Sequence, residues 1–417
     1  MGVKTRIHPR QPGSAGVADF VDPQESLNEL EELARSAGAR VVAKTLQSRE
    51  RLDPATLVGR GKLEEIHREA AAQNADLLIF DHELTPTQQR NIERESGCRV
   101  VDRTQVILDI FARHARTREG QLQVELAQLS YLLPRLTGRG VEMSRLGGGI
   151  GTRGPGETQL EMDRRRIRRR IRWLGENLEA VRAQRMRRRS RRSSVPIATL
   201  ALVGYTNAGK STLFNQLTPA GVLASPQMFA TLDPTARQLE LPSRRRVLLS
   251  DTVGFIRNLP HTLIQAFRAT LEEVVEAEML LLVSDSSSPS RAQQEEQVER
   301  VLAEIGASNQ SILRISNKVD LLTPADREAL RGRGDTILIS ARTGEGIPAL
   351  LAAIDDRLTV DPIERVRLCF EPREGKMLNA VYECGRVLHR EDAEDCVTLE
   401  AEIPRSLVNH LRDHLAN

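Results

Sequence analysis

The sequence predicts a multidomain α/β protein, and three observations carry that prediction. At 417 residues the chain is two to four times the usual domain length. Short β-branched runs alternate with helical patterns in two separate stretches, which is typical of parallel sheets covered by helices. Between those stretches, apolar residues recur at spacings of four and three, as they do along packed helices.

Composition narrows the class of protein. Hydrophobic residues make up 40% and charged residues 28% of the chain, an ordinary globular balance. No apolar run approaches the roughly 18 residues that cross a bilayer, and the first residues lack the apolar core of a signal peptide. Four scattered cysteines are too few for a disulfide framework or a zinc site. We therefore expect a cytoplasmic protein without stable membrane insertion.

Residues 1–20 are predicted to form a flexible tail, and residues 21–105 a small N-terminal parallel α/β domain. Helical patterns at 26–39, 61–73 and 85–97 alternate with apolar runs at 40–47, 75–81 and 98–103. This order predicts βαβ units. The segment Gly59–Lys62 could contact phosphate, but a loop that precedes the next helix explains it more simply.

Residues 106–195 are predicted to form an antiparallel helical hairpin and a linker. Two a/d stripes, each about two heptads long, can bury each other if one loop joins them. The stripes are Leu122, Leu126, Leu129, Leu133 and Leu136, then Ile167, Ile171, Leu174, Leu178 and Val181. Pro134 should end or kink the first arm near Leu133. Residues 187–196 have the composition of a linker.

The loop between the arms, residues 145–159, holds six glycines between Gly147 and Gly156. Two interpretations stay open: a flexible turn, or a bare backbone that approaches a phosphate-rich surface between Arg145 and Arg153. The second arm is strongly basic, with fourteen Arg against two acids between Arg164 and Arg192. A solvated helix face could explain it, but a net charge of +12 over 29 residues favours an anionic partner.

Residues 196–358 predict a doubly wound α/β domain, and residues 359–417 a small α+β C-terminal module without recognisable chemistry. Apolar strands recur through the larger domain, with helical patterns between them. They are expected at 197–204, 245–251, 279–285, 311–317 and 336–340.

A phosphate-binding loop lies between the first strand of this domain and a helical run. Its eight residues fit the pattern G-x-x-x-x-G-K-[ST]: Gly204, Tyr205, Thr206, Asn207, Ala208, Gly209, Lys210 and Ser211. Glycines let backbone N–H groups surround phosphates at a helix N-terminus. Lys210 would reach the β- and γ-phosphates, and the Ser211 hydroxyl would bind Mg²⁺.

A second motif selects guanine over adenine. Asn317, Lys318, Val319 and Asp320 follow an apolar strand, where an Asp carboxylate can accept both the N1–H and the exocyclic amine of guanine. Lys318 would lie over the base, and Asn317 would brace the phosphate loop. The segment Ser340, Ala341 and Arg342, after the next strand, would supply a backbone contact to guanine O6. The sequence therefore predicts a P-loop GTPase domain that binds GTP or GDP.

The remaining motifs would sense the γ-phosphate. Asp251 would hold Mg²⁺ through water, and the Gly254 amide would contact the γ-phosphate. Thr231 is the predicted switch threonine that completes the metal shell, with Thr235 as the alternative. Lys210, Thr231 and Gly254 are the candidate catalytic residues. The predicted nucleotide-binding set also includes Phe229, Ala230, Leu232, Asp233, Thr252 and Val253.

Phe255 follows Gly254 at the position where Ras-like GTPases have a water-orienting Gln. An aromatic ring cannot orient a water, so intrinsic hydrolysis should be slow. By analogy with related GTPases, Asn207 could help to hold a K⁺ ion against the phosphates.

These motifs resemble the translation-factor-related branch of GTPases, and residues 229–235 with residues 251–256 resemble the HflX family. Further segments at 57–66, 80–93, 102–138 and 147–167 are similar to that family's N-terminal and linker regions. The resemblance implies a GTPase that binds the large ribosomal subunit and splits stalled or idle ribosomes, notably under stress. It also implies contact with ribosomal RNA through the N-terminal domain and the Arg-rich hairpin, and a monomer off the ribosome.

Two other classes of function remain possible from the sequence. One is a GTP-sensing RNA-binding or ribosome-binding protein that acts by occupying its binding site and whose GTP hydrolysis is incidental. Phe255, in place of a water-orienting Gln, is the residue that supports this alternative. The other is a membrane-surface protein that uses the Arg-rich helix. The apolar residues of that helix form a narrow seam rather than the broad face of an interfacial anchor.

Overall fold

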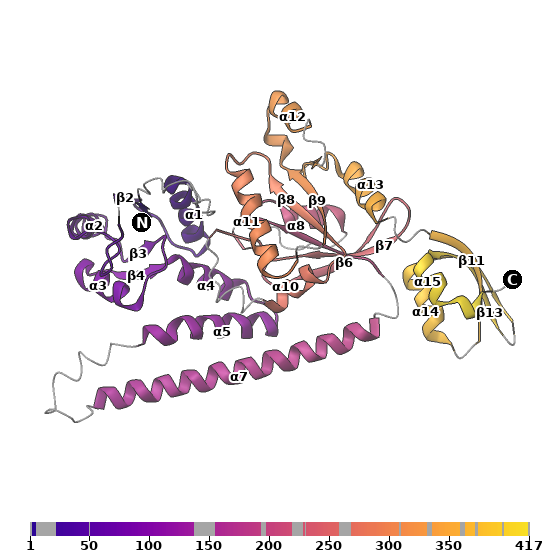
Figure 1. Cartoon of the computed structure of the whole chain (residues 1–417), viewed down its shortest axis with the longest axis horizontal. Coiled ribbons are helices and arrows are strands. Elements are labelled where there is room, and N and C mark those ends of the chain that lie inside the picture. The colour runs from indigo at the N-terminus through magenta and orange to yellow at the C-terminus, as the bar shows by residue number, and fades with distance from the viewer. Residues whose placement is uncertain are drawn as a thin grey trace, which may run out of the picture. The chain divides into compact units, whose positions relative to one another are not determined.

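The structure is a computed structural model that describes most of the chain. The described residues are 2–5, 22–49, 51–136, 155–192, 197–218, 228–229, 231–257, 268–307, 310–331, 336–358, 363–371, 374–393 and 396–415. They fall into two compact units, residues 1–178 with 259–266 and residues 179–258 with 267–417. Figure 1 shows the elements. No helix in these ranges is both long and apolar enough to cross a membrane.

The N-terminal domain alternates strands and helices, but its first strand lies at residues 2–5, where the sequence predicts a flexible tail, and its last helix extends past residue 105. Its elements are β1 (Gly2–Thr5), α1 (Pro23–Ser36), β2 (Leu46–Arg49), α2 (Arg60–Ala72), β3 (Leu77–Phe80), α3 (Pro86–Ser96), β4 (Arg99–Asp102) and α4 (Arg103–His114). The strands form two parallel pairs, β1 with β2 and β3 with β4. The strand expected at 40–47 begins only at Leu46, so residues 40–45 form no strand.

A buried ion-pair cluster ties α1 and α4 to the loop after β3. The Arg103 side chain is 2% exposed and pairs with Asp81 at 2.8 Å and with Glu29. Ser26 donates to the other Asp81 oxygen at 2.6 Å. Because the charges are paired and hydrogen-bonded, this polar cluster can be accommodated in the interior.

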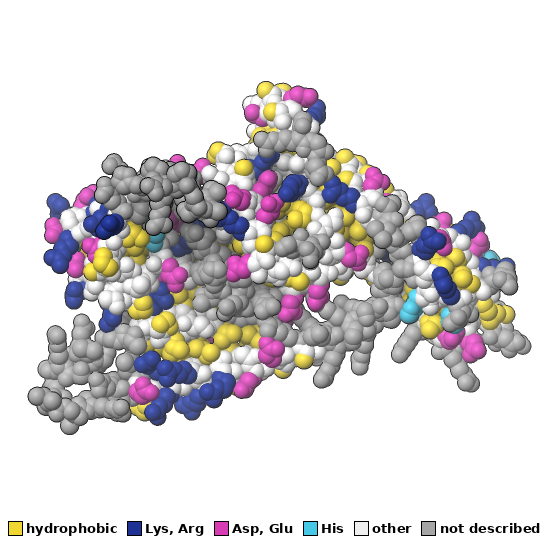
Figure 2. Space-filling view, in the orientation of Figure 1, with side chains coloured by type: hydrophobic (Ala, Val, Ile, Leu, Met, Phe, Trp, Pro, Cys, Tyr) yellow, Lys and Arg dark blue, Asp and Glu magenta, His cyan; other side chains and the backbone are white. Residues whose placement is uncertain are grey.

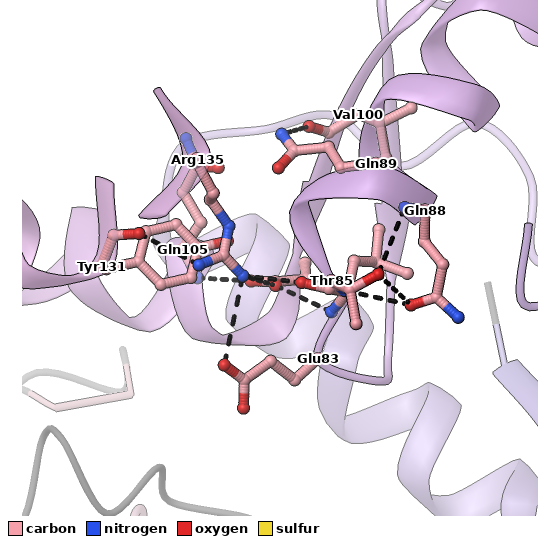
Figure 3. Close-up of polar contacts among 10 residues, drawn as sticks. Glu83, Thr85, Gln88, Gln89, Val100, Gln105, Tyr131 and Arg135 are labelled. Carbon is pink, nitrogen blue, oxygen red and sulfur yellow. Dashed lines mark hydrogen bonds and ion pairs between the residues drawn. The ribbon is translucent and has the colours of Figure 1, made fainter. Parts of the chain in front are cut away.

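Asp102 joins three segments of the same domain. Its carboxylate accepts from the Gln105 and Leu84 amides at 2.9 and 3.1 Å, which caps α4 and holds the loop before α3. Arg135, in the last turn of α5 (Arg118–Arg135), donates to the same carboxylate at 3.2 Å and lies over the Tyr131 ring. Figure 3 shows Arg135 between Tyr131 and the loop that carries Glu83 and Thr85. Asp102 therefore fixes the end of α5 on the domain.

The predicted helical hairpin is present, with α5 and α7 (Pro155–Arg192) as its arms. Leu122, Leu174 and Leu178 form a buried cluster, with Leu126 and Leu129 packed against it. Arg170 also makes two hydrogen bonds to the Glu125 carboxylate, at 2.7 and 2.8 Å. The first arm ends one residue after Pro134, as expected.

Two details of the hairpin differ from the prediction. The helix α7 begins at Pro155 and so includes residues 155–159 of the predicted glycine-rich loop, while residues 145–154 lie outside the described residues. It ends at Arg192, so most of the predicted linker at 187–196 is helical. Arg has a high helix propensity, which lets the basic run continue the helix.

The larger domain has one six-stranded sheet in the order β10-β9-β8-β5-β7-β6. Its strands are β5 (Thr199–Gly204), β6 (Thr235–Glu240), β7 (Arg246–Asp251), β8 (Met279–Asp285), β9 (Ser311–Asn317) and β10 (Thr336–Leu338). Its helices are α8 (Lys210–Leu217), α10 (Arg268–Val275), α11 (Arg291–Glu304), η1 (Val319–Leu321), α12 (Pro324–Arg331) and α13 (Ile347–Arg357). Among the described strands of this sheet only β6 is antiparallel to its neighbour, and the sequence prediction missed it.

This sheet places the sequence motifs at one edge. Its core is continuous, with Leu200, Leu202, Leu281 and Ile315 at 1% exposure or less. Because the parallel strands end at the same edge, the segments after β5, β7, β8 and β9 meet there, at the reversal of strand order next to β5.

The C-terminal module is the small α+β unit that the sequence predicts. It contains β11 (Ile363–Phe370), α14 (Gly375–Cys384), β12 (Arg386–Asp392), β13 (Val397–Pro404), α15 (Arg405–His410) and η2 (Arg412–His414). The three strands form an antiparallel sheet in the order β11-β13-β12. Figure 1 shows both helices on one face of this sheet, where Phe370, Val381 and Leu407 are fully buried.

Candidate nucleotide-binding site

The phosphate loop joins β5 to α8, and two of its residues must be glycine. Gly204 ends β5 with φ +150°, and Gly209 precedes α8 with φ +94°, a backbone region that disfavours side chains. A Cβ at Gly209 would lie 2.2 Å from Asn317 Nδ2. The loop and the Asn317 side chain therefore fit together only because residue 209 has no side chain.

Lys210 lies inside the loop. Its Nζ donates to the carbonyl oxygens of Gly204 and Tyr205 at 3.1 and 2.7 Å, and the residue is 6% exposed. Burial lowers the pKa of Lys210 to about 8, opposed by the charge of Asp251. A buried ammonium held by neutral carbonyls is stabilised by an anion brought close to it, which suits the phosphates of a nucleotide.

Ser211, Thr231 and Asp251 converge beside this ammonium. The Ser211 and Thr231 hydroxyls lie 2.8 Å apart, and each donates to Asp251 Oδ2 at 2.8 Å. Asp251 is fully buried, and burial raises the pKa of its carboxyl, opposed first by Lys210. Residues from α8, from the segment before β6 and from the end of β7 thus share one polar cluster.

This cluster fits a magnesium ion. Two hydroxyls and a carboxylate are oxygen donors of the kind that Mg²⁺ prefers. The second carboxylate oxygen, Asp251 Oδ1, is buried without a hydrogen-bond partner in the described part of the chain. A buried oxygen without a partner costs free energy, and a cation nearby would remove that cost.

Asn317 links the phosphate loop to the guanine motif. Its Nδ2 donates to the Ala208 carbonyl at 2.9 Å, and its Oδ1 accepts from the Ala341 amide at 2.9 Å. Val319 is buried and donates its amide to the Ile339 carbonyl at 3.2 Å. The two segments at 317–320 and 340–342 are therefore held together by backbone and amide bonds.

Asp320 sits at the centre of that pair of segments. It accepts from Ser340 Oγ at 2.6 Å and from Arg342 Nη2 at 2.5 Å. The Ser340 hydrogen bond is the main cause that lowers the pKa of Asp320, so the side chain is an anion at neutral pH. Because the Arg342 side chain is 72% exposed, it can leave the carboxylate for solvent when a base arrives.

The segment around Thr231 is described at residues 228–229 and from 231 onward, so Ala230 lies outside the described residues. Phe229 is 3% exposed with φ +58°, and Leu232 is 1% exposed, while Asp233 is only half-buried. Thr235, the alternative switch threonine, is the first residue of β6 and faces Asp251 across the ladder. Of the two threonines, Thr231 is the one in the Asp251 cluster.

Phe255 is part of the core beside the phosphate loop. Its amide donates to the Gly204 carbonyl at 3.1 Å, and its carbonyl accepts from the Thr206 amide at 2.7 Å. The residue is 2% exposed. Its ring is therefore buried in the core. Burial explains better than its aromatic character why this side chain cannot position a water.

The neighbouring residues hold the same segment in place. The Thr252 hydroxyl donates to the Leu202 carbonyl at 2.5 Å, and Val253 is 8% exposed. A Cβ at Gly254 would lie 3.0 Å from Lys210 Nζ. Gly254 is thus close to the ammonium, whereas Asn207 is exposed with φ +60°.

Sequence reasoning missed one charged partner of the site. Asp285, the last residue of β8, accepts from Lys318 Nζ at 2.7 Å. The sequence could have indicated this residue, because Asp285 ends a strand at the same sheet edge as the other motifs. This contact restrains the Lys318 side chain at that edge of the sheet.

Comparison with known sequences agrees with this site. Four family profiles match: "GTP-binding GTPase N-terminal" at 24–112, "GTP-binding GTPase Middle Region" at 114–192, "50S ribosome-binding GTPase" at 199–318 and "HflX C-terminal domain" at 327–417. The GTPase HflX of Caldanaerobacter subterraneus is 47% identical over 394 residues, 94% of this chain and 91% of that protein. GTPase HflX of Escherichia coli is 44% identical over 384 residues, 91% of this chain and 90% of that protein.

Among solved structures, a GTP-binding protein from Sulfolobus solfataricus in complex with GDP is similar. It is 27% identical, with a TM-score of 0.43, and the match covers 81% of this chain and 96% of that one. Taken with the phosphate loop and the guanine motif, the sequence matches over nearly the whole chain identify a P-loop enzyme that binds and hydrolyses GTP. The chain belongs to the HflX family of GTPases.

Proposed function

We propose that this GTPase acts in the cytoplasm, binds the large ribosomal subunit and splits stalled or idle ribosomes under stress. The family profile over residues 199–318, described as a 50S ribosome-binding GTPase, supports the partner. In this proposal the protein is a monomer off the ribosome, hydrolyses GTP slowly alone, and is accelerated on the subunit.

The basic surface of α7 is the observation that carries the proposal. Six arginines of its described part are exposed: Arg165, Arg166, Arg168, Arg169, Arg170 and Arg172. Figure 2 shows a patch of Lys and Arg side chains in the region of α7. Guanidinium groups on a helix suit the phosphates of a folded RNA, which is recognised by shape and charge.

The apolar side of the same helix is occupied by α5. Leu174 is fully buried and Leu178 is 5% exposed, both in the cluster with Leu122. The leucines therefore hold the two arms together while the six arginines stay exposed, one of which, Arg170, also bonds to Glu125 of the other arm. We assign this Arg-rich hairpin and the N-terminal domain as the ribosome-binding parts.

Within the site, each cluster would have one task. Lys210 would bind the β- and γ-phosphates and offset their charge, because its ammonium is already held at the loop by two carbonyls. Thr231 and Gly254 would respond to the γ-phosphate, since they lie beside Asp251 and Lys210 respectively. Asp320 would accept two hydrogen bonds from guanine, and the pair of Asp285 and Lys318 would flank the base.

Two ions belong to the proposal. Ser211 and Thr231 would hold Mg²⁺ with Asp251 behind them, and the bound ion would neutralise phosphate charge. A K⁺ ion near Asn207 remains a prediction from the sequence alone.

A second candidate function is a GTP-dependent occupant of the ribosome whose hydrolysis is incidental. The buried ring of Phe255 favours it, because the position that orients water in Ras-like GTPases holds a core side chain here. In that case the GTP-bound form alone would split ribosomes, and release of the protein would not require hydrolysis.

The first test is steady-state GTP hydrolysis with and without purified large subunits. We expect a large stimulation that disappears in Lys210→Ala. Arg331→Ala, a change at an exposed side chain of α12 in the same domain, is the matched control and should keep it. A rate that subunits leave unchanged, despite tight GTP binding, would contradict the proposed partner.

Splitting with a non-hydrolysable GTP analogue separates the two candidate functions. If one round of splitting proceeds with the analogue but repeated rounds require GTP, hydrolysis resets the cycle. If the analogue supports as many rounds as GTP, hydrolysis is incidental.

A further inference from the structure

Thr206, the third residue of the phosphate loop, carries a buried hydroxyl. The residue is 6% exposed, and its Oγ1 has no hydrogen-bond partner in the described part of the chain. A hydroxyl that is buried without a partner costs free energy, whereas valine has nearly the same shape without that cost. Packing alone therefore gives no reason for a threonine at this position.

The Thr206 side chain lies where the γ-phosphate is expected. A Cβ at Gly254 would lie 3.0 Å from Lys210 Nζ and 3.0 Å from both Cα and Cγ2 of Thr206. The ammonium and the threonine side chain thus approach Gly254 from two sides. Since Lys210 is the group that would bind the β- and γ-phosphates, a nucleotide that reaches Lys210 also comes close to Thr206.

The backbone attaches Thr206 to the segment that follows Gly254. The Thr206 amide donates to the Phe255 carbonyl at 2.7 Å, and the Phe255 amide donates to the Gly204 carbonyl at 3.1 Å. Residue 255 is where Ras-like GTPases have the Gln that orients water, but the Phe255 side chain is buried in the core. Thr206 therefore supplies a polar group beside the position that lacks one.

We propose that the Thr206 hydroxyl positions the attacking water in GTP hydrolysis and so replaces the missing Gln. A hydroxyl can accept one hydrogen bond and donate another, so Oγ1 would accept from the water and donate to a γ-phosphate oxygen. The water oxygen bonds to the γ-phosphorus, the bond to the oxygen shared with the β-phosphate breaks, and GDP leaves. The proton of the water ends on the released phosphate, so Thr206 neither gains nor loses one. This inference rests on the proposed roles of Lys210 and Gly254 and not on the ribosome.

Two substitutions in the full chain, without ribosomes, test the hydroxyl. Thr206→Val keeps the shape of the side chain and removes the hydroxyl, whereas Thr206→Ser keeps the hydroxyl. We expect single-turnover GTP hydrolysis to be roughly 10- to 100-fold slower in Thr206→Val, the range for one hydrogen bond to a charged group, and Thr206→Ser to keep most of the rate. GDP affinity should be unchanged in both variants, because GDP has no γ-phosphate.

Two further measurements do not depend on turnover. GDP with aluminium fluoride imitates the γ-phosphoryl group during its transfer to water, and Thr206→Val should bind this complex at least about tenfold more weakly. Nucleotide-free Thr206→Val should melt at the same or a higher temperature, because it loses a buried hydroxyl without a partner.

Thr218→Val is the matched control. Thr218 is 4% exposed, but its hydroxyl donates to the Phe214 carbonyl at 2.7 Å. Removing that hydroxyl should lower the melting temperature, because the hydrogen bond is lost, and should leave GTP hydrolysis unchanged.

A Thr206→Val protein with the original rate and normal binding of the aluminium fluoride complex would overturn the proposal. A lower melting temperature of nucleotide-free Thr206→Val would also overturn it, because the hydroxyl would then have a structural partner. Lys210→Ala distinguishes this failure from failure of the whole site. If Lys210→Ala abolishes hydrolysis and Thr206→Val does not slow it, only the role of Thr206 is wrong; if neither change has an effect, the assigned site is wrong.

Discussion

Arg135 and Asp102 form a buried ion pair between the first hairpin arm and the N-terminal domain. Arg135 Nη2 lies 3.2 Å from Asp102 Oδ2, and the two side chains are 11% and 1% exposed. The same guanidinium donates to the Leu84 carbonyl at 2.7 Å. The hairpin is thus attached to the domain by an ion pair that is largely shielded from water.

Replacing Arg135 should weaken the protein and its ribosome binding together. Arg135→Met leaves Asp102 buried without its cation, which costs roughly 3–5 kcal/mol in the free energy of unfolding of this unit. The last turn of α5 also loses its anchor, so we expect a higher KM for large subunits with an unchanged intrinsic rate of GTP hydrolysis. Urea unfolding and subunit titration measure the two effects.

The control for Arg135 is Arg90→Met, which removes an exposed arginine of α3 in the same domain. It should leave the free energy of unfolding unchanged. An Arg135→Met protein with normal stability would show that the ion pair contributes nothing net.

Asp320→Asn should change the base that the protein binds. In the proposed site the carboxylate would accept two N–H groups of guanine, whereas an amide could donate one hydrogen bond to the extra carbonyl of xanthine. We expect GTP affinity to fall by about 100-fold or more and XTP affinity to rise, because hydrogen bonds to a charged group are worth about 1.5–3 kcal/mol each. Competition binding with both nucleotides measures this change.

Asp326→Asn removes a carboxylate from the exposed surface of α12 and is the matched control. If both variants still prefer guanine nucleotides, Asp320 does not select the base.

Gly209→Ala should abolish nucleotide binding more than it destabilises the fold. The new Cβ would lie 2.2 Å from Asn317 Nδ2 and would displace the side chain that holds the Ala208 carbonyl. Gly306→Ala isolates the backbone cost, because Gly306 also has a positive φ, of +83°, but no atom within 4 Å of a new Cβ. Both variants should lose roughly 1–2 kcal/mol of stability. Only Gly209→Ala should lose GTP binding in equilibrium titration.

Phe255→Gln should not accelerate GTP hydrolysis. The side chain at 255 is directed into the core, so a glutamine there would bury an amide rather than orient a water, at a cost of roughly 1–3 kcal/mol. Single-turnover hydrolysis and thermal unfolding of Phe255→Gln and Phe255→Leu test this expectation. A tenfold faster rate in the glutamine variant alone would show that residue 255 can reach the nucleotide.

Leu174→Ala should separate the hairpin arms. Leu174 is fully buried against α5, and its truncation should cost about 2–5 kcal/mol. Met162→Ala, on the same helix but at a 51% exposed residue, should cost little. Hydrogen exchange in residues 118–135 measures this loss of hairpin stability. Equal effects of the two substitutions would contradict the hairpin packing.

Much of this architecture follows from local patterns in the sequence. The leucine spacing around Leu122 and Leu174 predicted the hairpin because apolar residues on one helix face have to be covered. The phosphate loop was predictable because few residues fit its two key positions. Position 209 needs a backbone with positive φ, which glycine adopts readily, and position 210 needs a long cationic side chain that can reach phosphates. The meeting of these motifs at one sheet edge followed from parallel topology.

What the sequence did not predict depends on contacts between distant residues. β6 reads as a polar segment, and only its pairing with β7 makes it a strand. Two ion pairs, Asp285 with Lys318 and Arg135 with Asp102, each join residues that are 33 positions apart. No local sequence pattern predicts them. Residues 40–47 have the composition of a strand, yet most of them lack a neighbouring strand to pair with.

The length of α7 has a mechanical consequence. Its 38 residues form one continuous helix, which at about 1.5 Å per residue spans roughly 57 Å. Leu178 is the last residue of one compact unit and Glu179 the first of the other within this helix. Such a rod acts as a lever arm, since a tilt of about 10° at one end displaces the other by roughly 10 Å.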